Sequence, residues 1–152
     1  MVIAILDNDV LVYLFEEIYL ADRKKFGEIM DYLILRFNEI WIPKEVKREF
    51  FEIRKRRNRL GRLMKKHSMI KDCPITISKN EINLILSDQI DQGEADGIFQ
   101  TRKIGDYRKY TSKKFLFVSN DRPALRGADT FGIDFLPYEK LRDEWRQMGV
   151  EV

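Results

Sequence analysis

The chain alternates short runs of mainly apolar residues with longer segments in which apolar residues recur at helical spacing. The runs at Val2–Leu6, Glu39–Ile42 and 115–119 have the length and composition of buried strands. A further strand is expected at 133–136, and a short extended piece at 74–77. The pattern therefore predicts several short strands that are separated along the sequence by helices.

Helical periodicity is clearest at 21–37, where Phe26, Met30, Leu33 and Phe37 share one apolar face. The same reasoning predicts helices at 10–15, 44–58, 78–85, 93–99, Arg122–Thr130 and 138–148. A polar stretch at 103–114 reads as a loop. Strands that alternate with helices predict an α/β fold, a three-layer α/β/α sandwich with a central, mainly parallel sheet.

Within the segment 44–58, Val46, Phe50 and Ile53 are expected to face the core. Glu45 and Glu49 are one helical turn apart on the same segment, so at least one of them should point toward the end of the sheet. The sequence leaves open which of the two does so.

The composition favours a single domain over residues 1–152. This length can bury a core without disulfides, and the one cysteine, Cys73, has no intramolecular partner. The N-terminal apolar run is too short to span a membrane and is interrupted by Asp7 and Asp9. No targeting signal is recognisable. We therefore expect a cytoplasmic protein with no membrane partner.

A strongly basic helical segment occupies residues 54–66, although the net charge of the whole chain is only +3. It holds eight basic residues and no acidic one: Arg54, Lys55, Arg56, Arg57, Arg59, Arg62, Lys65 and Lys66. Either one helix ends at 58–61 and another covers 62–69, or a single helix bends at Gly61. Such a run is either a solvated helix face or an edge that binds nucleic-acid phosphates.

Acidic residues recur at the ends of predicted strands and on predicted helices with apolar faces. Asp7 follows the first strand, Asp121 follows the strand at 115–119, and Glu49 and Glu94 lie on helices. Each acid taken alone could simply cap a helix. Because parallel strands end at the same edge of a sheet, we expect these four carboxylates to converge there.

Converging carboxylates repel one another unless a divalent cation lies between them, and Mg²⁺ or Mn²⁺ prefers such oxygen ligands. A cation of this kind supports hydrolysis of phosphodiesters by activating water, which leaves a 5′-phosphate and a 3′-hydroxyl. Metal-free RNA cleavage usually needs a pair of histidines, whereas His67 is the only histidine. Neither a GxGxxG nor a GxxxxGK[ST] motif occurs.

Four short motifs occur in order: Ile-Leu-Asp7-Asn-Asp, Ile42-Pro-Lys-Glu-Val-Lys-Arg-Glu49, Gly93-Glu94-Ala-Asp96, and Val118-Ser-Asn-Asp121 followed by Arg122 and Ala124. Together they resemble the ordered signature of the PIN domain, in particular its Gly-Glu-Ala-Glu subgroup. The resemblance spans about residues 2–141. It implies an α/β/α fold and an acidic, Mg²⁺- or Mn²⁺-dependent endoribonuclease. It also implies RNA as substrate, a small antitoxin protein as partner of a toxin ribonuclease, and a homodimer.

The resemblance also assigns roles to residues. Asp7, Glu94 and Asp121 would hold the metal, and Glu49 would complete the acidic cluster, with Glu45 as the alternative. Asp96 would replace or assist Glu94, and Asn120 would orient Asp121 or the scissile phosphate. The chain departs from the subgroup at Gly97, where alanine is preferred, and in its richly basic segment, which could be an RNA-binding clip.

Two other functions are compatible with parts of the sequence. Asp7-Asn-Asp9-Val10 also resembles the first motif of haloacid-dehalogenase-like phosphatases, in which Asp7 would be the nucleophile and Asp9 the general acid. The motifs around Glu49 and Glu94 have no place in that family. A non-catalytic RNA-binding PIN module is the third hypothesis.

Overall fold

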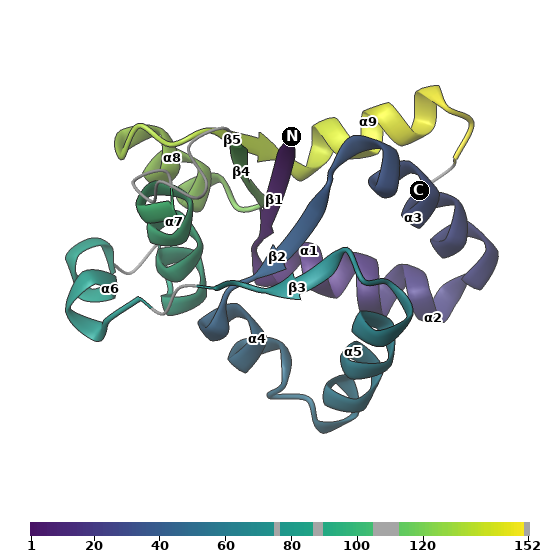
Figure 1. Ribbon diagram of the computed structural model, residues 1–152, viewed down its shortest axis with the longest axis horizontal. Coiled ribbons are helices and arrows are strands. Elements are labelled where there is room, and N and C mark those ends of the chain that lie inside the picture. Colours follow the sequence, from purple (N-terminus) through teal and green to yellow (C-terminus); the bar gives the residue numbers. More distant parts are fainter. Residues whose placement is uncertain (75–76, 87–89, 105–112, 151–152) are drawn as a thin grey trace.

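A five-stranded sheet forms the centre of the computed structural model, which describes residues 1–74, 77–86, 90–104 and 113–150 (Figure 1). The strands are β1 (Val2–Leu6), β2 (Glu39–Ile42), β3 (Ile70–Asp72), β4 (Lys114–Ser119) and β5 (Phe135–Pro137). They lie in the order β3-β2-β1-β4-β5, and every neighbouring pair is parallel. The predicted α/β/α architecture is therefore confirmed, with a sheet that is entirely parallel.

Helical segments connect the strands and cover both faces of the sheet. They are α1 (Asn8–Val12), the π-helical segment η1 (Tyr13–Ile18), α2 (Tyr19–Ala21), α3 (Arg23–Arg36), α4 (Lys44–Phe50), α5 (Arg54–Lys66), α6 (Lys79–Ile85), α7 (Gln92–Ile104), α8 (Arg122–Thr130) and α9 (Tyr138–Gln147). Figure 1 shows α7 and α8 on one side of the sheet and α3 and α9 on the other. Within the described part of the chain, none of these helices is long and apolar enough to cross a membrane.

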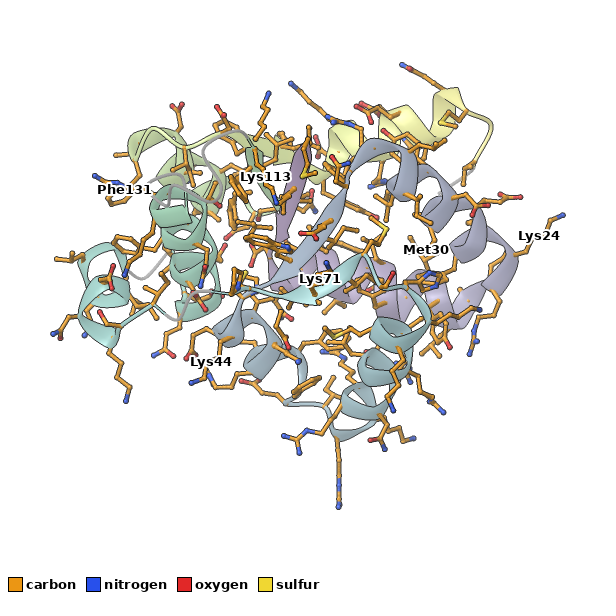
Figure 2. The ribbon with its side chains drawn as sticks, viewed as in Figure 1. Lys24, Met30, Lys44, Lys71, Lys113 and Phe131 are labelled. Carbon is orange, nitrogen blue, oxygen red and sulfur yellow. The ribbon has the colours of Figure 1, made fainter. Side chains whose placement is uncertain are left out.

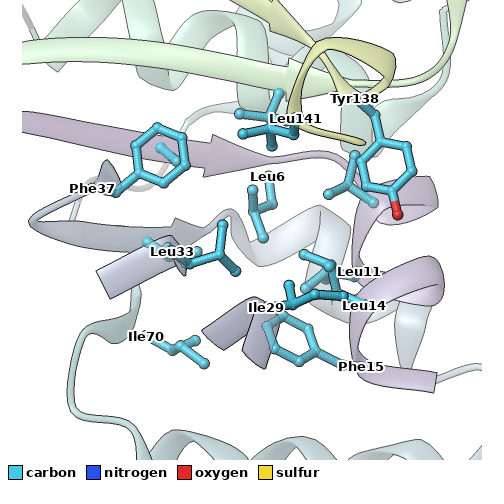
Figure 3. Close-up of a cluster of buried hydrophobic side chains, with 14 of the residues drawn as sticks. Leu6, Leu11, Leu14, Phe15, Ile29, Leu33, Phe37, Ile70, Tyr138 and Leu141 are labelled. Atoms are coloured by element: carbon cyan, nitrogen blue, oxygen red, sulfur yellow. The ribbon is translucent and has the colours of Figure 1, made fainter. Parts of the chain in front are cut away.

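Alternate residues of the central strands belong to different cores, because successive side chains of a strand point to opposite faces. Ala4 and Leu6 of β1 pack in the larger core with residues of α3 and α9 (Figure 3). Ile3 and Ile5 pack on the opposite side. The buried face predicted at 21–37 is confirmed, since Phe26, Met30, Leu33 and Phe37 all lie in the larger core.

The chain breaks between α4 and α5, so the single helix predicted at 44–58 is wrong. Ile53 adopts an extended backbone conformation, and its side chain is 48% exposed rather than buried. The break lets α5 turn so that Leu60 and Leu63 enter the larger core. The helix then continues through Gly61 to Lys66 without the interruption considered for the basic segment.

The edge strands differ most from the sequence prediction. β3 was not predicted because only Ile70 is buried, while Lys71 and Asp72 are exposed and give no apolar run. Residues 75–76 of the predicted extended piece, and 105–112 of the predicted loop, lie outside the described residues. β5 begins two residues later than expected, because its pairing starts with Phe135 opposite Phe117 of β4.

The order of the strands reverses direction at β1 and β4, which makes their carboxyl ends the switch point of the sheet. From β1 the chain moves outward to β2 and β3, and then returns to place β4 and β5 on the other side of β1. Connections that leave neighbouring parallel strands in opposite directions separate at the sheet edge, and ligands of open α/β sheets bind there. Asp7 follows β1 and Asp121 follows β4, so both residues lie at this switch point.

The close contact between α7 and β4 predicts a large difference between two glycine substitutions. A Cβ at Gly97 would lie 2.7 Å from Cε1 of Phe117, whereas a Cβ at Gly61 would meet nothing within 4 Å. We expect Gly97→Ala to destabilise the protein by about 1–3 kcal/mol, because α7 must move away from the sheet. Gly61→Ala should stabilise it by about 0.5–1 kcal/mol, since alanine favours the helix. Urea unfolding measures both, and equal midpoints for the two variants would contradict this packing.

Candidate active site

Asp7 is fixed at the carboxyl end of β1 and is only 3% exposed. Its backbone N–H donates to the carbonyl oxygen of Val118 in β4, at 3.0 Å. Its Oδ1 accepts from the N–H of Asn8 at 2.7 Å, so Asp7 caps α1. Its Oδ2 accepts from the hydroxyl of Ser119 at 2.7 Å. The residue therefore combines the capping role with a position at the switch point of the sheet.

Ser119 connects the two central strand ends. Its hydroxyl donates to Asp7 and also accepts from the backbone N–H of Asp121 at 3.0 Å. The backbone N–H of Asn120, between these two residues, donates to Oδ2 of Asp9 at 3.0 Å. These three hydrogen bonds hold the turn after β4 against the start of α1. They therefore fix the position of the Asp121 backbone, from which its carboxylate projects.

Glu94 lies at the start of α7 in a reciprocal pair with Asp91. The Asp91 N–H donates to Oε1 of Glu94 at 3.1 Å, and the Glu94 N–H donates to Oδ1 of Asp91 at 2.9 Å. The Asp121 carboxyl lies within hydrogen-bonding reach of Glu94 and contributes to raising the pKa of that acid. Glu94 is therefore next to Asp121, although the two residues come from different layers.

The structure distinguishes Glu49 from Glu45. Oε1 of Glu49 accepts the N–H of Gly93 at 2.8 Å, directly beside Glu94. A Cβ at Gly93 would lie 2.7 Å from that same oxygen, so a larger residue there would displace Glu49. The Glu45 carboxylate instead binds Nε of Arg48 at 2.6 Å. Of the two candidates, Glu49 is the one held at the start of α7.

Asp96 serves a different part of the fold. Its Oδ2 accepts from the backbone N–H of Glu45 at 3.0 Å, at the start of α4. The charges that act on its carboxyl are those of Glu45 and Lys44. The structure thus brings Asp7, Glu49, Glu94 and Asp121 to one region but turns Asp96 toward α4.

Two acids near these residues were not assigned to the nuclease site from the sequence. Asp9 was considered only as the acid of a phosphatase, and Asp91 was not considered. The negative charge of Asp91 raises the pKa of Asp7, Asp9, Glu49 and Glu94, so it lies close to all four. The spacing Asp91-x-x-Glu94 is that of a helix capping box and could have identified Asp91. No comparable sequence motif would have identified Ser119.

Burial and mutual repulsion both favour the protonated forms of these acids. Burial is the largest cause in each case, and it raises the pKa of Asp7 well above its usual range. Burial and the nearby charges raise the pKa of Asp9 to about 6 and that of Glu49 to about 7. Burial, the hydrogen bond with Asp121 and the charge of Asp7 raise the pKa of Glu94 to about 10.

The site supplies carboxylate oxygen donors. Oε2 of Glu94 and Oδ1 of Asp9 are buried, and in the described ranges no N–H or hydroxyl group donates to them, although the Asp121 carboxyl lies beside Glu94. Hard oxygen donors of this kind suit Mg²⁺ or Mn²⁺. In the same ranges, no group of three or more Asp, Glu, His or Cys side chains is already arranged to hold a metal ion. The chemistry of the donors thus fits a divalent cation, and binding would require the side chains to draw together.

The eight basic residues of α5 divide into two groups. Arg56 and Arg59 are half-buried and form ion pairs with Glu16 of η1, and Arg57 lies over the ring of Phe51. Apart from Arg56 and Arg59, all basic residues of α5 are exposed: Arg54, Lys55, Arg57, Arg62, Lys65 and Lys66. Figure 2 shows basic side chains of α5 projecting away from the molecule at the bottom of the view. Part of the segment therefore anchors α5, and the rest forms a basic surface.

Comparison with protein-family models finds none that matches this chain, and comparison with curated protein sequences finds no significant relative. The geometry and chemistry described above are therefore the basis for the function proposed below.

The buried acids predict that stability falls as pH rises from about 5 to about 8. Asp9, Glu49 and Glu94 have folded-state pKa values of about 6, 7 and 10, against ordinary values of 3.8, 4.5 and 4.5. In this interval the folded protein holds protons that the unfolded chain has released, so raising the pH favours unfolding.

Urea unfolding in EDTA at several pH values tests this. Glu94→Gln should raise stability at pH 8 and flatten the pH dependence, because the amide never ionises. Glu139→Gln is the matched control, since Glu139 is exposed on α9. A Glu94→Gln protein with the same pH dependence as the unsubstituted protein would contradict the assigned electrostatics.

Proposed function

We propose that this protein is a metal-dependent endoribonuclease of the PIN type, which hydrolyses RNA phosphodiesters. The observation that carries the proposal is that Asp7, Glu94 and Asp121 lie together where β1 and β4 end. Acids whose pKa values are raised both by burial and by specific neighbouring charges are candidates for a functional site. Oε2 of Glu94 is buried beside the carboxyl of Asp121 and, within the described residues, receives no hydrogen bond from an N–H or hydroxyl group, which supports a cation between these acids.

Asp7, Glu94 and Asp121 would hold Mg²⁺ or Mn²⁺. When bound, such a cation neutralises phosphoryl charge and lowers the pKa of a coordinated water. Ser119 holds Asp7 in place through its hydroxyl and holds the turn before Asp121 through the same atom. The chain thus fixes two of the ligands with one side chain.

Glu49 is suited to accept a proton from the attacking water. Its pKa of about 7 places the carboxylate near the pH at which a general base works best. The Gly93 N–H fixes Oε1, which orients the carboxylate. Asn120, on the turn between the strand end and Asp121, would contact the scissile phosphate.

The basic surface of α5 would bind the RNA backbone, and its exposed residues are available for phosphates. We extend the proposal to a cytoplasmic protein that forms homodimers and pairs with a small antitoxin protein, as the resemblance to toxin ribonucleases implies. A non-catalytic RNA-binding module would use the same basic surface but would have no use for the buried acids.

The phosphatase hypothesis is less well supported. Both carboxylate oxygens of Asp7 already accept hydrogen bonds, from Asn8 and Ser119, and the residue is almost fully buried. A nucleophilic carboxylate needs an oxygen that can reach the substrate. Each Asp7 oxygen keeps a second lone pair for a cation, and Glu94, which lies close enough for the Asp7 charge to raise its pKa, has no role in the phosphatase. We therefore propose a role for Asp7 in binding a cation rather than in covalent catalysis.

The first test is cleavage of a mixed RNA pool in Mg²⁺, Mn²⁺ or EDTA. We expect cleavage with either metal, none in EDTA, and products with 5′-phosphates. Asp7→Asn should lower the rate at least about 100-fold, because losing even an outer partner of a metal ligand costs roughly 10–100-fold. Asp129→Asn, at an exposed acid of α8, should cleave normally.

Two results would contradict the nuclease proposal. One is cleavage that survives both chelation and Asp7→Asn. The other is metal-dependent hydrolysis of a phosphate monoester, without RNA cleavage, that Asp9→Asn abolishes; this result would favour the phosphatase.

The second test measures RNA binding in EDTA as a function of salt. Replacing Arg54, Arg62 and Lys65 together by alanine should weaken binding and reduce the salt slope by up to about 2, at roughly 0.7 for each lost phosphate contact with a single strand. The control replaces three exposed lysines elsewhere, Lys24, Lys79 and Lys140. Equal losses in the two triple variants would show that α5 is only a solvated face.

A further inference from the structure

A pocket of about 310 Å³ lies between the helical segment that follows β1 and the helix that follows β5. Its wall includes Tyr13, Ile18 and Ala21 on the first segment and Tyr138 and Arg142 on α9. Both segments begin at the carboxyl edge of the sheet, where the candidate active site lies. A volume of this size is at the lower end of the range for small-molecule sites.

Tyr138 connects this pocket to the acidic site. Its ring lines the pocket, and Figure 3 shows it at the edge of the larger core, beside the helical segment after β1. Burial raises the pKa of the Tyr138 phenol, and the charges of Glu17 and Asp9 raise it further. Asp9 in turn is bonded to the turn that carries Asp121. Pro137, the residue before Tyr138, pairs with Ser119, whose hydroxyl binds Asp7. The pocket and the proposed cation ligands therefore lie at neighbouring strand ends.

Two aromatic residues line the pocket, and Tyr13 is the more exposed of the two, since Tyr138 is buried. The rings of Tyr13 and Tyr138 stack with centroids 5.2 Å apart and an angle of 7° between their planes. Tyr13 begins the π-helical segment η1, a conformation that is often found at functional sites. In this segment Leu14 and Phe15 enter the core while Tyr13 and Ile18 face the pocket. Nucleobases stack on aromatic rings of this kind.

The charges at the pocket favour a base that carries a phosphate over a free anion. Lys25 and Arg142 supply positive charge, and Glu17 and Asp22 supply an equal negative charge. Oδ1 of Asp22 accepts a hydrogen bond from the backbone N–H of Lys25 at 3.0 Å, so it is not available to a ligand. A flat, uncharged ring fits the apolar wall, the cations can contact a phosphate joined to it, and Glu17 can accept from an amino group of the base.

We propose that this pocket binds one nucleobase of the RNA strand, next to the phosphate that is cleaved. This inference rests on the proposed function only in one respect: the RNA strand is taken to run from the pocket to the acidic site. The ligand class, a nucleobase with an attached phosphate, follows from the pocket alone.

Binding of AMP to the full-length protein in EDTA tests the pocket without any cleavage. Calorimetry should show saturable binding with a Kd below about 10 mM. NMR chemical-shift changes of backbone amides on adding AMP should centre on Tyr13, Ile18 and Arg142. Tyr13→Leu should weaken binding about tenfold or more, as expected when a stacked base loses its ring, whereas Tyr13→Phe should retain it. Arg142→Gln should also weaken binding, and Lys140→Gln, at an exposed residue of the same helix, should not.

The possible outcomes test the proposed nucleobase pocket and the proposed nuclease activity separately. No saturable AMP binding, shifts centred elsewhere, or equal binding of inorganic phosphate would overturn the pocket, even if RNA is cleaved. AMP binding in the pocket without RNA cleavage would support the pocket and overturn the nuclease. If both hold, Tyr13→Leu should raise KM for RNA about tenfold while kcat stays near its original value. Circular dichroism confirms that each variant is folded.

Discussion

The parallel pairing of β1 with β4 is the constraint on which the rest of the site depends. It places the end of one strand against the end of the other, so that Asp7 binds both the Val118 backbone and the Ser119 hydroxyl. The price is a buried carboxylate next to other acids, which disfavours the folded state unless protons or a cation compensate the charge. The buried acids therefore lower the stability of the folded protein, and acids arranged in this way are candidates for a functional site.

The first turn of α7 positions the remaining acids. Asp91 and Glu94 bind each other's N–H groups at the start of α7, and the adjacent Gly93 N–H holds Glu49 of α4. Asp96, one turn further on, fixes the start of α4 in return. The two helices therefore depend on each other, and a change at either start would move both glutamates.

The sequence revealed the strand ends but not the long-range contacts. Asp7 and Asp121 follow continuous apolar runs, so alternation of strands and helices was enough to place them at one edge. The choice of Glu49 over Glu45 depends on the Gly93 N–H, which comes from a residue 44 positions away. β3 contributes a single buried residue, and the π-helical segment follows no recognisable pattern, so neither could be predicted. The basic segment gave the composition of α5 but not the pairing of Arg56 and Arg59 with Glu16.

The central claim is that the carboxylates of β1, β4 and α7 form one cation site. Crystals grown with Mn²⁺ and measured at its absorption edge test it most directly, because anomalous scattering locates the metal without reference to activity. The account predicts one strong peak within coordination distance of Asp7, Glu94 and Asp121, with those side chains closer together than in the metal-free protein. A fully occupied Mn²⁺ elsewhere, or none at this edge under saturating metal, would contradict it.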